Sequence, residues 1–411
     1  MEKRMNDMEV ASAAPVRTRR LWMAVILGAL SAFGPLSLDM YLPSLPRLAE
    51  ELHTSASTAQ LSLTACLLGL SLGQLLAGPV SDVRGRRKPL LIGLAIYCVS
   101  SFLCAMTPTI WGLILLRFMQ GAAGAAGIVL SRAMARDMYA GPELTRFFSL
   151  LMLVNGVAPI FAPIAGGQLL QITSWQGVFV VLGLIGLIMF LVVAFGLPET
   201  LPAQKRSSGG LKNTFATFGG LLTDRVFMGF ALSQGLVIAA MFAYISGSPF
   251  VLQDIYGMSP QMFSLCFAVN GVGIIIAGQM TGRLAARLGE VRLLAAGLAL
   301  ASISGILLLL MILLKAGLIG ILLPLFIVVS CVGIVSTSAF SLAMQNQAKS
   351  AGSASALLGV LSFIFGGLVA PLVGLGGSQT AIPMGVVIAA AEVGSVLCYL
   401  GLAGRRRTNE E

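Results

Sequence analysis

The sequence predicts an all-α integral membrane protein whose twelve transmembrane helices form two pseudo-symmetric six-helix bundles, with both termini in the cytoplasm. Hydrophobic residues make up 57% of the 411 residues. Charged residues make up 10%, whereas soluble domains carry about 25%. The apolar runs are each about 20 residues long, the length that crosses roughly 30 Å of hydrocarbon as a helix, and they lack the alternation of a membrane β-barrel.

Twelve such runs follow one another, six on each side of one long polar connection. They cover residues 22–43, 58–79, 89–106, 111–134, 146–170, 176–197, 226–248, 260–281, 293–314, 318–343, 352–374 and 381–403. The chain then divides into a cytoplasmic tail (1–21), a six-helix bundle (22–198), a cytoplasmic linker (199–225), a second bundle (226–403) and a tail (404–411). The first run follows basic residues, as in a signal peptide, but it exceeds the usual 7–15 residues, so we expect it to be retained.

The basic residues support this number of spans and set the orientation. Lys and Arg gather in the cytoplasmic loops of membrane proteins. With the N-terminus inside, 23 of the 26 Lys and Arg residues lie on the cytoplasmic side, and the exceptions are Arg47, Arg117 and Lys315. Because these positive charges are spread over loops, the net charge of +10 indicates topology and does not indicate nucleic-acid binding.

The inventory of reactive side chains argues against an enzyme or a metal centre. The six cysteines all lie in apolar runs without a C-x-x-C pair, and His53 is the single histidine. Such cysteines are expected to be small buried hydrophobes and not metal ligands or disulfides. A membrane enzyme would need a cluster of acid, base or nucleophile at one depth, and the scattered acids offer none.

Asp39 is the most informative residue of the first run, which reads Phe33-Gly-Pro-Leu-Ser-Leu-Asp-Met-Tyr-Leu-Pro43. A carboxylate surrounded by hydrocarbon is costly unless it is neutralised, paired or facing a wet cavity, so it belongs by default to an ion or substrate pathway. The alternative is that Asp39 marks the outer end of the span and is in contact with water.

The loop after the second span carries a recognisable pattern, Gly78-Pro-Val-Ser-Asp82-Val-Arg84-Gly85-Arg86-Arg87-Lys88-Pro89. Asp82 can accept from helix amides and from the Arg fork, and Pro89 suits a helix start. The run resembles the G-x-x-x-D-R-x-G-R-R/K signature of the major facilitator superfamily. The resemblance implies a gating role, in which the motif latches the two halves in the outward-facing state, for Gly78, Asp82, Arg84, Gly85, Arg86 and Arg87. A degenerate copy at 278–289 lacks the acid.

The fourth span contains Arg117-Phe-Met-Gln120-Gly121, which is similar to the R-F-x-Q-G motif of the drug:proton antiporters in that superfamily. Arg117, Gln120 and Gly121 share one helix face. A guanidinium inside the membrane needs a partner, and Asp39 is the one plausible acid in the same half, so we expect the two to pair and to couple proton movement. The alternative is a purely structural ion pair.

The fifth span, Asn155-Gly156-Val-Ala-Pro159-Ile-Phe-Ala-Pro163-Ile-Ala-Gly166-Gly167, partly matches the G-x-x-x-G-P-x-x-G-G antiporter motif, with Ala162 in place of a glycine. The matching residues are Gly156, Pro159, Pro163, Gly166 and Gly167. The prolines should bend the helix, and the small residues should let a neighbouring helix approach closely. In the family the motif accompanies exporters, although small-residue packing without directional meaning is the alternative.

Three further segments narrow the resemblance: 38–46, Arg136-Asp137-Met-Tyr139 and 241–251. They are similar to the Bcr/CflA, or bicyclomycin-resistance, subgroup of drug:proton antiporters. The resemblance implies a monomeric, multi-pass protein of the bacterial inner membrane, in contact with lipid, that exports bicyclomycin- or phenicol-like drugs. It also implies that transport is driven by the proton gradient without any cofactor. An exporter of a small metabolite such as cysteine would share every motif, and an uptake symporter is the other alternative.

The candidate substrate contacts come from both halves of the chain: Asp39, Tyr41, Gln120, Asn155, Met241, Tyr244 and Asn270. With a single acid in the first span, neutral or zwitterionic cargo is favoured over permanent cations. Glu392 in the last span is expected to face lipid, protonated or reaching toward the basic ends, because the twelfth helix is peripheral in this superfamily.

Overall fold

The computed structural model describes residues 22–206, 218–345, 347 and 351–403, with both predicted tails and the middle of the predicted linker outside the described residues. Twelve helices in the described part are long and apolar enough to cross a membrane, which confirms the predicted number. Several continue beyond the predicted spans; the second, for example, runs from Ala56 to Arg84. These helices extend past their apolar runs because polar residues can continue a helix into the membrane–water interface.

The first span, Trp22–Glu51, is a broken helix. Helical residues 22–31 are followed by α2 (Phe33–Asp39), a 3-10 turn η1 (Leu42–Ser44) and α3 (Leu45–Glu51). Pro43 and Pro46 each lie in the first turn of the element that follows the break, where a missing amide costs nothing. The break falls directly after Asp39.

Single helices form most of the remaining spans. In the N-terminal half they are α4 (Ala56–Arg84), α5 (Arg87–Met106), α6 (Ile110–Met138), α7 (Gly141–Leu169) and α8 (Trp175–Gly196). In the C-terminal half they are α10 (Arg225–Pro249) with its π-helical extension η3 (Phe250–Ile255), α11 (Pro260–Leu288), α12 (Glu290–Leu313), α13 (Gly317–Met344), α14 (Ala351–Val373) and α15 (Ile382–Cys398) with its extension η5 (Tyr399–Ala403). Short 3-10 turns lie at η2 (Ala203–Lys205) and η4 (Gly374–Gly376).

The second helix of each half shows the internal symmetry most clearly. α4 and α11 both contain 29 residues, and both begin after a serine whose hydroxyl accepts from a first-turn amide. Each ends at a glycine with positive φ, Gly85 (φ 89) and Gly289 (φ 81). This conformation favours glycine, so the motif and its degenerate copy share the same turn.

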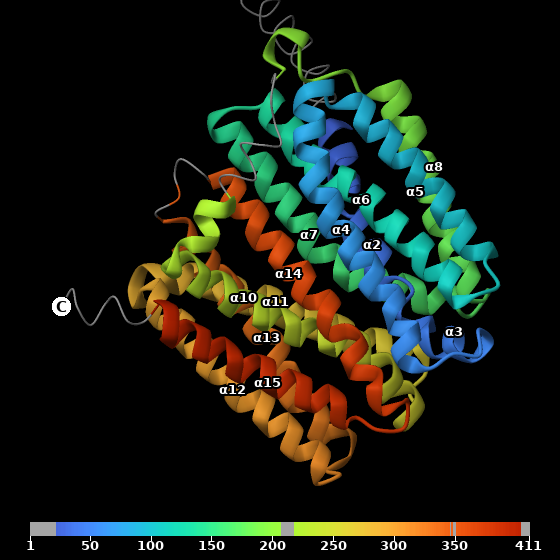
Figure 1. Ribbon diagram of the computed structural model, residues 1–411, viewed down its shortest axis with the longest axis vertical. Coiled ribbons are helices and arrows are strands. Elements are labelled where there is room, and N and C mark those ends of the chain that lie inside the picture. The colour runs from blue at the N-terminus through green and yellow to red at the C-terminus, as the bar shows by residue number, and fades with distance from the viewer. Residues whose placement is uncertain (1–21, 207–217, 346, 348–350, 404–411) are drawn as a thin grey trace, which may run out of the picture.

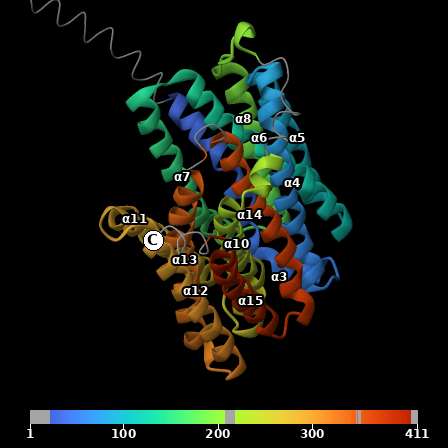
Figure 2. The same cartoon turned by 60° about the vertical axis from the view of Figure 1, so that its left-hand side comes forward.

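The two halves lie side by side and meet along two helix pairs. In Figure 1 the blue and green N-terminal helices form one group and the yellow to red C-terminal helices the other. α14 packs along α4, and α11 packs along α7; in Figure 2 α14 still lies beside α4. These pairs close the sides of the space between the halves.

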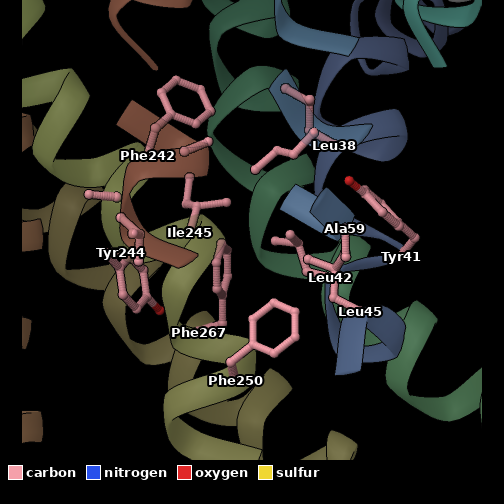
Figure 3. Packing of buried hydrophobic residues seen from close by; sticks show 14 of the residues in the cluster. Leu38, Tyr41, Leu42, Leu45, Ala59, Phe242, Tyr244, Ile245, Phe250 and Phe267 are labelled. Carbon is pink, nitrogen blue, oxygen red and sulfur yellow. The ribbon is translucent and has the colours of Figure 1, made fainter. Parts of the chain in front are cut away.

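One hydrophobic cluster is shared by both halves, and it extends from the ends that are predicted to be periplasmic to the middle of the spans. In this cluster Leu38, Leu42 and Leu45 face Ile245 and Phe250, as Figure 3 shows. Toward the predicted cytoplasmic ends the buried core separates into two clusters. The buried members of one come from the N-terminal half, and those of the other come from residues 218–358.

Polar contacts between the halves follow the same division. Between described residues, the hydrogen bonds that cross the halves join Ser57 to Pro371, Gln60 to Ser246, Thr64 to Gly367, Gln253 to Pro43, Gln261 to Gly167 and Ser264 to Pro163. All of these residues lie in the outer halves of their spans in the predicted orientation. The structure is therefore closed on the predicted periplasmic side, as in an inward-facing conformation.

Candidate functional site

A central cavity of about 400 Å³ lies between the two halves. Its volume falls within the roughly 300–1,000 Å³ of typical small-molecule sites. Five of the seven predicted substrate contacts line it: Asp39, Asn155, Met241, Tyr244 and Asn270. The cavity therefore brings together side chains that are up to 231 positions apart, from Asp39 to Asn270. That they bind substrate stays a prediction.

Asp39 lies in the wall of this cavity, at the last residue of α2. Its side chain is buried, with a relative exposure of 6%. Among the described residues the structure gives its carboxylate no hydrogen bond and no ion pair. The alternative interpretation, in which Asp39 is bathed by water at the end of the span, does not fit this position.

The predicted ion pair between Asp39 and Arg117 is wrong for this conformation. Arg117 is fully buried, and its guanidinium carbon lies 4.3 Å from the centre of the Tyr41 ring and 5.5 Å from that of Phe179. Two residues along a helical turn point about 200° apart. Asp39 therefore faces the cavity, while Tyr41 turns toward the interior of the N-terminal half and meets Arg117.

Tyr41 and Gln120 are likewise not cavity residues, contrary to the prediction. The Tyr41 hydroxyl is 3.2 Å from the Ser62 hydroxyl, and Gln120 accepts from Arg117 at 2.5 Å and donates to Ser101 at 2.7 Å. Nε and Nη2 of Arg117 have no partner among the described residues. The R-F-x-Q-G motif thus forms a buried polar cluster around the cation Arg117. This cluster lies behind the cavity wall, where α5, α6 and the first span meet.

The C-terminal half provides an aromatic and amide wall opposite Asp39. Asn270 donates to the Tyr244 hydroxyl at 2.9 Å, and the Tyr244 ring stacks on Phe267 with centroids 5.5 Å apart. Met241 adds a flexible thioether that adapts to irregular shapes. This wall combines hydrogen-bonding groups with apolar surface, as amphiphilic ligands require.

Two polar residues of the cavity lining were not among the predicted substrate contacts. Arg132 of α6 and Gln74 of α4 both line the cavity. Arg132 was counted among the 23 basic residues on the cytoplasmic side, and for that reason it was not considered as a cavity residue on α6. Arg132 lies four residues, about one helical turn, after Ile128, which also lines the cavity. This spacing places both side chains on the same face of α6 and could have identified Arg132 as a cavity residue.

The gating motif forms a network within the N-terminal half. Arg86 pairs with Asp82 of α4 and with Asp137 of α6, the latter at 2.8 Å, and it also donates to Ser81 at 2.7 Å. Burial acts to lower the pKa of Arg86, but its hydrogen bonds to Asp137 and Asp82 outweigh burial and raise that pKa above its usual value. One guanidinium thus ties α4 to α6.

Glu199, which follows α8, caps the start of α5 in place of Asp82. Its carboxylate accepts from the amides of Arg86 at 2.8 Å, Arg87 at 3.2 Å and Leu201 at 3.0 Å. Burial acts to raise the pKa of Glu199, but these amide donors and nearby Arg206 lower it below its usual value. The expectation that Asp82 accepts from helix amides is therefore wrong, because Glu199 occupies that position.

Two of the three motif glycines of the fifth span, Gly166 and Gly167, make the close contacts that were predicted, whereas Gly156 does not. A side chain at Gly166 would overlap the carbonyl oxygen of Met40 in the first span. A Cβ at Gly167 would lie 2.6 Å from the Ser264 hydroxyl of α11, across the halves. Pro159 and Pro163 both lie inside α7. The motif therefore fits α7 against the outer end of the opposite half.

Glu392 does not face lipid, which corrects the expectation. Its exposure is 0%, and both carboxylate oxygens lack a hydrogen-bond partner among the described residues. α15 packs against α10 and α12, and Glu392 lies next to Gly305 of α12, where a glycine leaves room for it. The last helix thus turns its one acid inward, away from the surface.

The fold and the cavity are those of a secondary transporter built from two halves around a midplane site. The family model of the Major Facilitator Superfamily matches residues 21–371, and the chain belongs to this family. It is 47% identical over 394 residues to an uncharacterized MFS-type transporter, YdgK, of Bacillus subtilis, covering 95% of this chain and 98% of that one. It is 31% identical to a bicyclomycin resistance protein homolog of Haemophilus influenzae, covering 92% and 95% of the two chains.

Solved structures show the same fold. A mutant of the nucleoside transporter NupG superposes with a TM-score of 0.75 at 14% identity, and the match covers 93% of this chain and 99% of that one. The chain is accordingly a multi-pass transporter of the inner membrane, similar to drug efflux proteins, and not an enzyme.

Proposed function

We propose that this transporter exports small amphiphilic antibiotics, bicyclomycin- or phenicol-like, in exchange for protons by alternating access. The observation that carries the proposal is the position of Asp39, a buried carboxylate in the wall of the central cavity that has no partner in the part of the chain that the structure describes. A carboxylate in such surroundings is easily neutralised by a proton. The proton and the drug then compete for the Asp39 carboxylate.

The cycle begins in the inward-facing conformation. Drug enters from the cytoplasm and occupies the cavity between Asp39 and the wall formed by Tyr244 and Asn270. The contacts at the outer end then open and those at the inner end close. A proton from outside neutralises Asp39, the drug leaves, and the protonated protein returns.

Arg117 acts in this proposal through Tyr41 and not through a direct ion pair. Its charge lies against the Tyr41 ring, two residues from Asp39 and next to the break in the first span. A change of charge at Asp39 alters the electrostatic energy of the buried guanidinium, which is poorly screened there. Arg117 thereby couples protonation to the position of the segment at the break.

The proton gradient is sufficient as the only energy source, without a cofactor. Import of one proton against a neutral drug moves one charge, worth about 3.5 kcal/mol at roughly 150 mV. This supports a drug gradient of several hundred-fold. We propose that the protein works as a monomer, because one chain contains both halves of the cavity.

The test replaces Asp39 by Asn and measures chloramphenicol and bicyclomycin efflux from cells that lack other pumps, with and without a protonophore. Asp39→Asn should abolish proton-dependent efflux while the protein remains inserted and folded. The control is Asp254→Asn, in the π-helical end of α10 and outside the cavity lining, which should retain efflux. Efflux by Asp39→Asn at the wild-type level removes Asp39 from the mechanism, and accumulation inside right-side-out vesicles favours an uptake symporter.

A further inference from the structure

The central cavity has opposite charges at its two ends. A Cβ at Gly127 of α6 would lie 2.8 Å from the Leu30 carbonyl oxygen, and one at Gly124 would lie 4.0 Å from Phe33. The helix α6 therefore runs antiparallel to the first span, with residue 127 level with residue 30. At 1.5 Å per residue, Asp39 lies about 14 Å from that level toward the periplasm, and Arg132 about 8 Å toward the cytoplasm. Both side chains line the same cavity.

The cytoplasmic end of the cavity presents hydrogen-bond donors without acceptors. Nε of Arg132 and Nε2 of Gln74 are buried and have no partner among the described residues. Arg132 forms no ion pair in that part of the chain, and the nearest cation in sequence on its helix, Arg136, is exposed. Unsatisfied donors of this kind are costly unless a ligand or water accepts from them.

The opposite end presents the reverse chemistry. Asp39 has a carboxylate without a donor among the described residues, beside an aromatic wall that includes Tyr244 and Phe267. An ammonium group gains from a carboxylate and from the faces of such rings. Neither charged residue compensates the other directly, because their levels along the helices are about 21 Å apart at 1.5 Å per residue.

We propose that Arg132 binds an acidic group of the cargo while Asp39 binds an amine at its other end, so that the site also takes amphoteric amphiphiles and binds them more tightly than analogues that lack either charge. This rests on the proposed function in so far as the cavity is the drug pathway. The volume of about 400 Å³ accommodates a drug-sized molecule whose apolar body lies against Met241 and Phe363. A cargo with a single positive charge meets Asp39 but also the repulsion of Arg132.

The experiment measures direct binding to the purified full chain in detergent, without a proton gradient. The probes are norfloxacin, with a carboxylate and a piperazine amine at opposite ends of a rigid ring system, its ethyl ester, which lacks the acid, and its N-acetyl derivative, which lacks the basic amine. Probe fluorescence anisotropy gives the dissociation constants. The wild type should bind norfloxacin more tightly than either derivative.

Two variants separate the two ends. Arg132→Gln should weaken norfloxacin binding about tenfold, as expected for a lost hydrogen bond to a charged group, and should not weaken binding of the ester, because it removes a charge that repels the ester. Asp39→Asn should weaken norfloxacin and the ester but not the N-acetyl derivative. The matched control Arg136→Gln, one turn along α6 and outside the cavity lining, should bind all three probes as the wild type does.

The proposal is overturned if the wild type does not prefer norfloxacin to both derivatives, or if Arg132→Gln weakens norfloxacin and ester equally or not at all. Its failure is distinct from failure of the proposed function. Should the efflux test show no proton dependence while these binding differences persist, the amphoteric site stands and proton-driven efflux falls. If efflux is proton-dependent but binding ignores Arg132, only the cargo assignment is lost.

Discussion

Gly167 is the residue at which a single methyl group should shift the conformational equilibrium. It lies on α7 where this helix meets α11 of the other half, and its carbonyl accepts from Gln261 at 2.8 Å. A Cβ here would lie 2.6 Å from the Ser264 hydroxyl and 3.1 Å from the Pro260 carbonyl oxygen. Gly167→Ala therefore forces α7 and α11 apart at the closed outer end.

The magnitude follows from the contacts that are lost. Ser264 donates to Pro163 across the halves at 2.8 Å, and moving its hydroxyl away from the new methyl group breaks this bond. A neutral hydrogen bond contributes about 1 kcal/mol, and strain against Pro260 brings the cost to about 1.5 kcal/mol. Because these contacts exist only when the outer end is closed, the inward-facing population should fall about tenfold relative to the outward-facing one.

The assay is a distance measurement by double electron–electron resonance between spin labels on the outer ends of the two halves. Ile172 and Gln379 are exposed positions there, and each is replaced by Cys for labelling. Cys266 and Cys398, the partly exposed native cysteines, are changed to Ser beforehand. Gly167→Ala should increase the population with the longer distance.

Gly156→Ala is the matched control on the same helix. Its Cβ would lie 3.7 Å from Ile275 of α11, an ordinary van der Waals contact, so the distance distribution should equal that of the wild type. If Gly167→Ala leaves the distribution unchanged, or if Gly156→Ala shifts it equally, the argument from close packing is refuted.

Two further predictions concern buried and capping carboxylates. Glu199 has a lowered pKa, so its stabilising contribution is present above its ordinary pKa of about 4.3 and is lost as the pH falls through the lowered value. In thermal unfolding scans from pH 7 to pH 3, the unfolding temperature of the wild type should exceed that of Glu199→Gln at neutral pH, and the two should converge in acid. A difference in unfolding temperature that stays constant with pH would contradict this. Glu392 is buried without a partner among the described residues, so Glu392→Gln should fold normally. Glu392→Lys should lower the stability of the folded protein by about 3 kcal/mol or more, seen as loss of monodisperse protein in size-exclusion chromatography. Equal yields of the two variants would show that the site is open to water or lipid headgroups.

The membrane fold was predictable from the sequence because its determinants are local. A span needs only a sufficient length of apolar side chains, and the orientation needs only the distribution of Lys and Arg. The gating motif was found for the same reason, since Asp82 and Arg86 are four positions apart on one turn. Its remaining partners, Asp137 and Glu199, come from distant segments and appeared only in the folded chain.

The sequence by itself determined that the chain spans the membrane twelve times, that it belongs with the drug transporters, and that the first span contains an acid, Asp39. Only the tertiary structure decided which way each polar side chain points. Arg117 meets Tyr41 and not Asp39, Arg132 faces the cavity, and Glu392 faces the interior of its own half. The physical reason is that a polar group buried within hydrocarbon is costly unless it is paired or neutralised, which the sequence already indicates. Which group pairs with it depends on the rotation and depth of neighbouring helices, and hydropathy does not encode these.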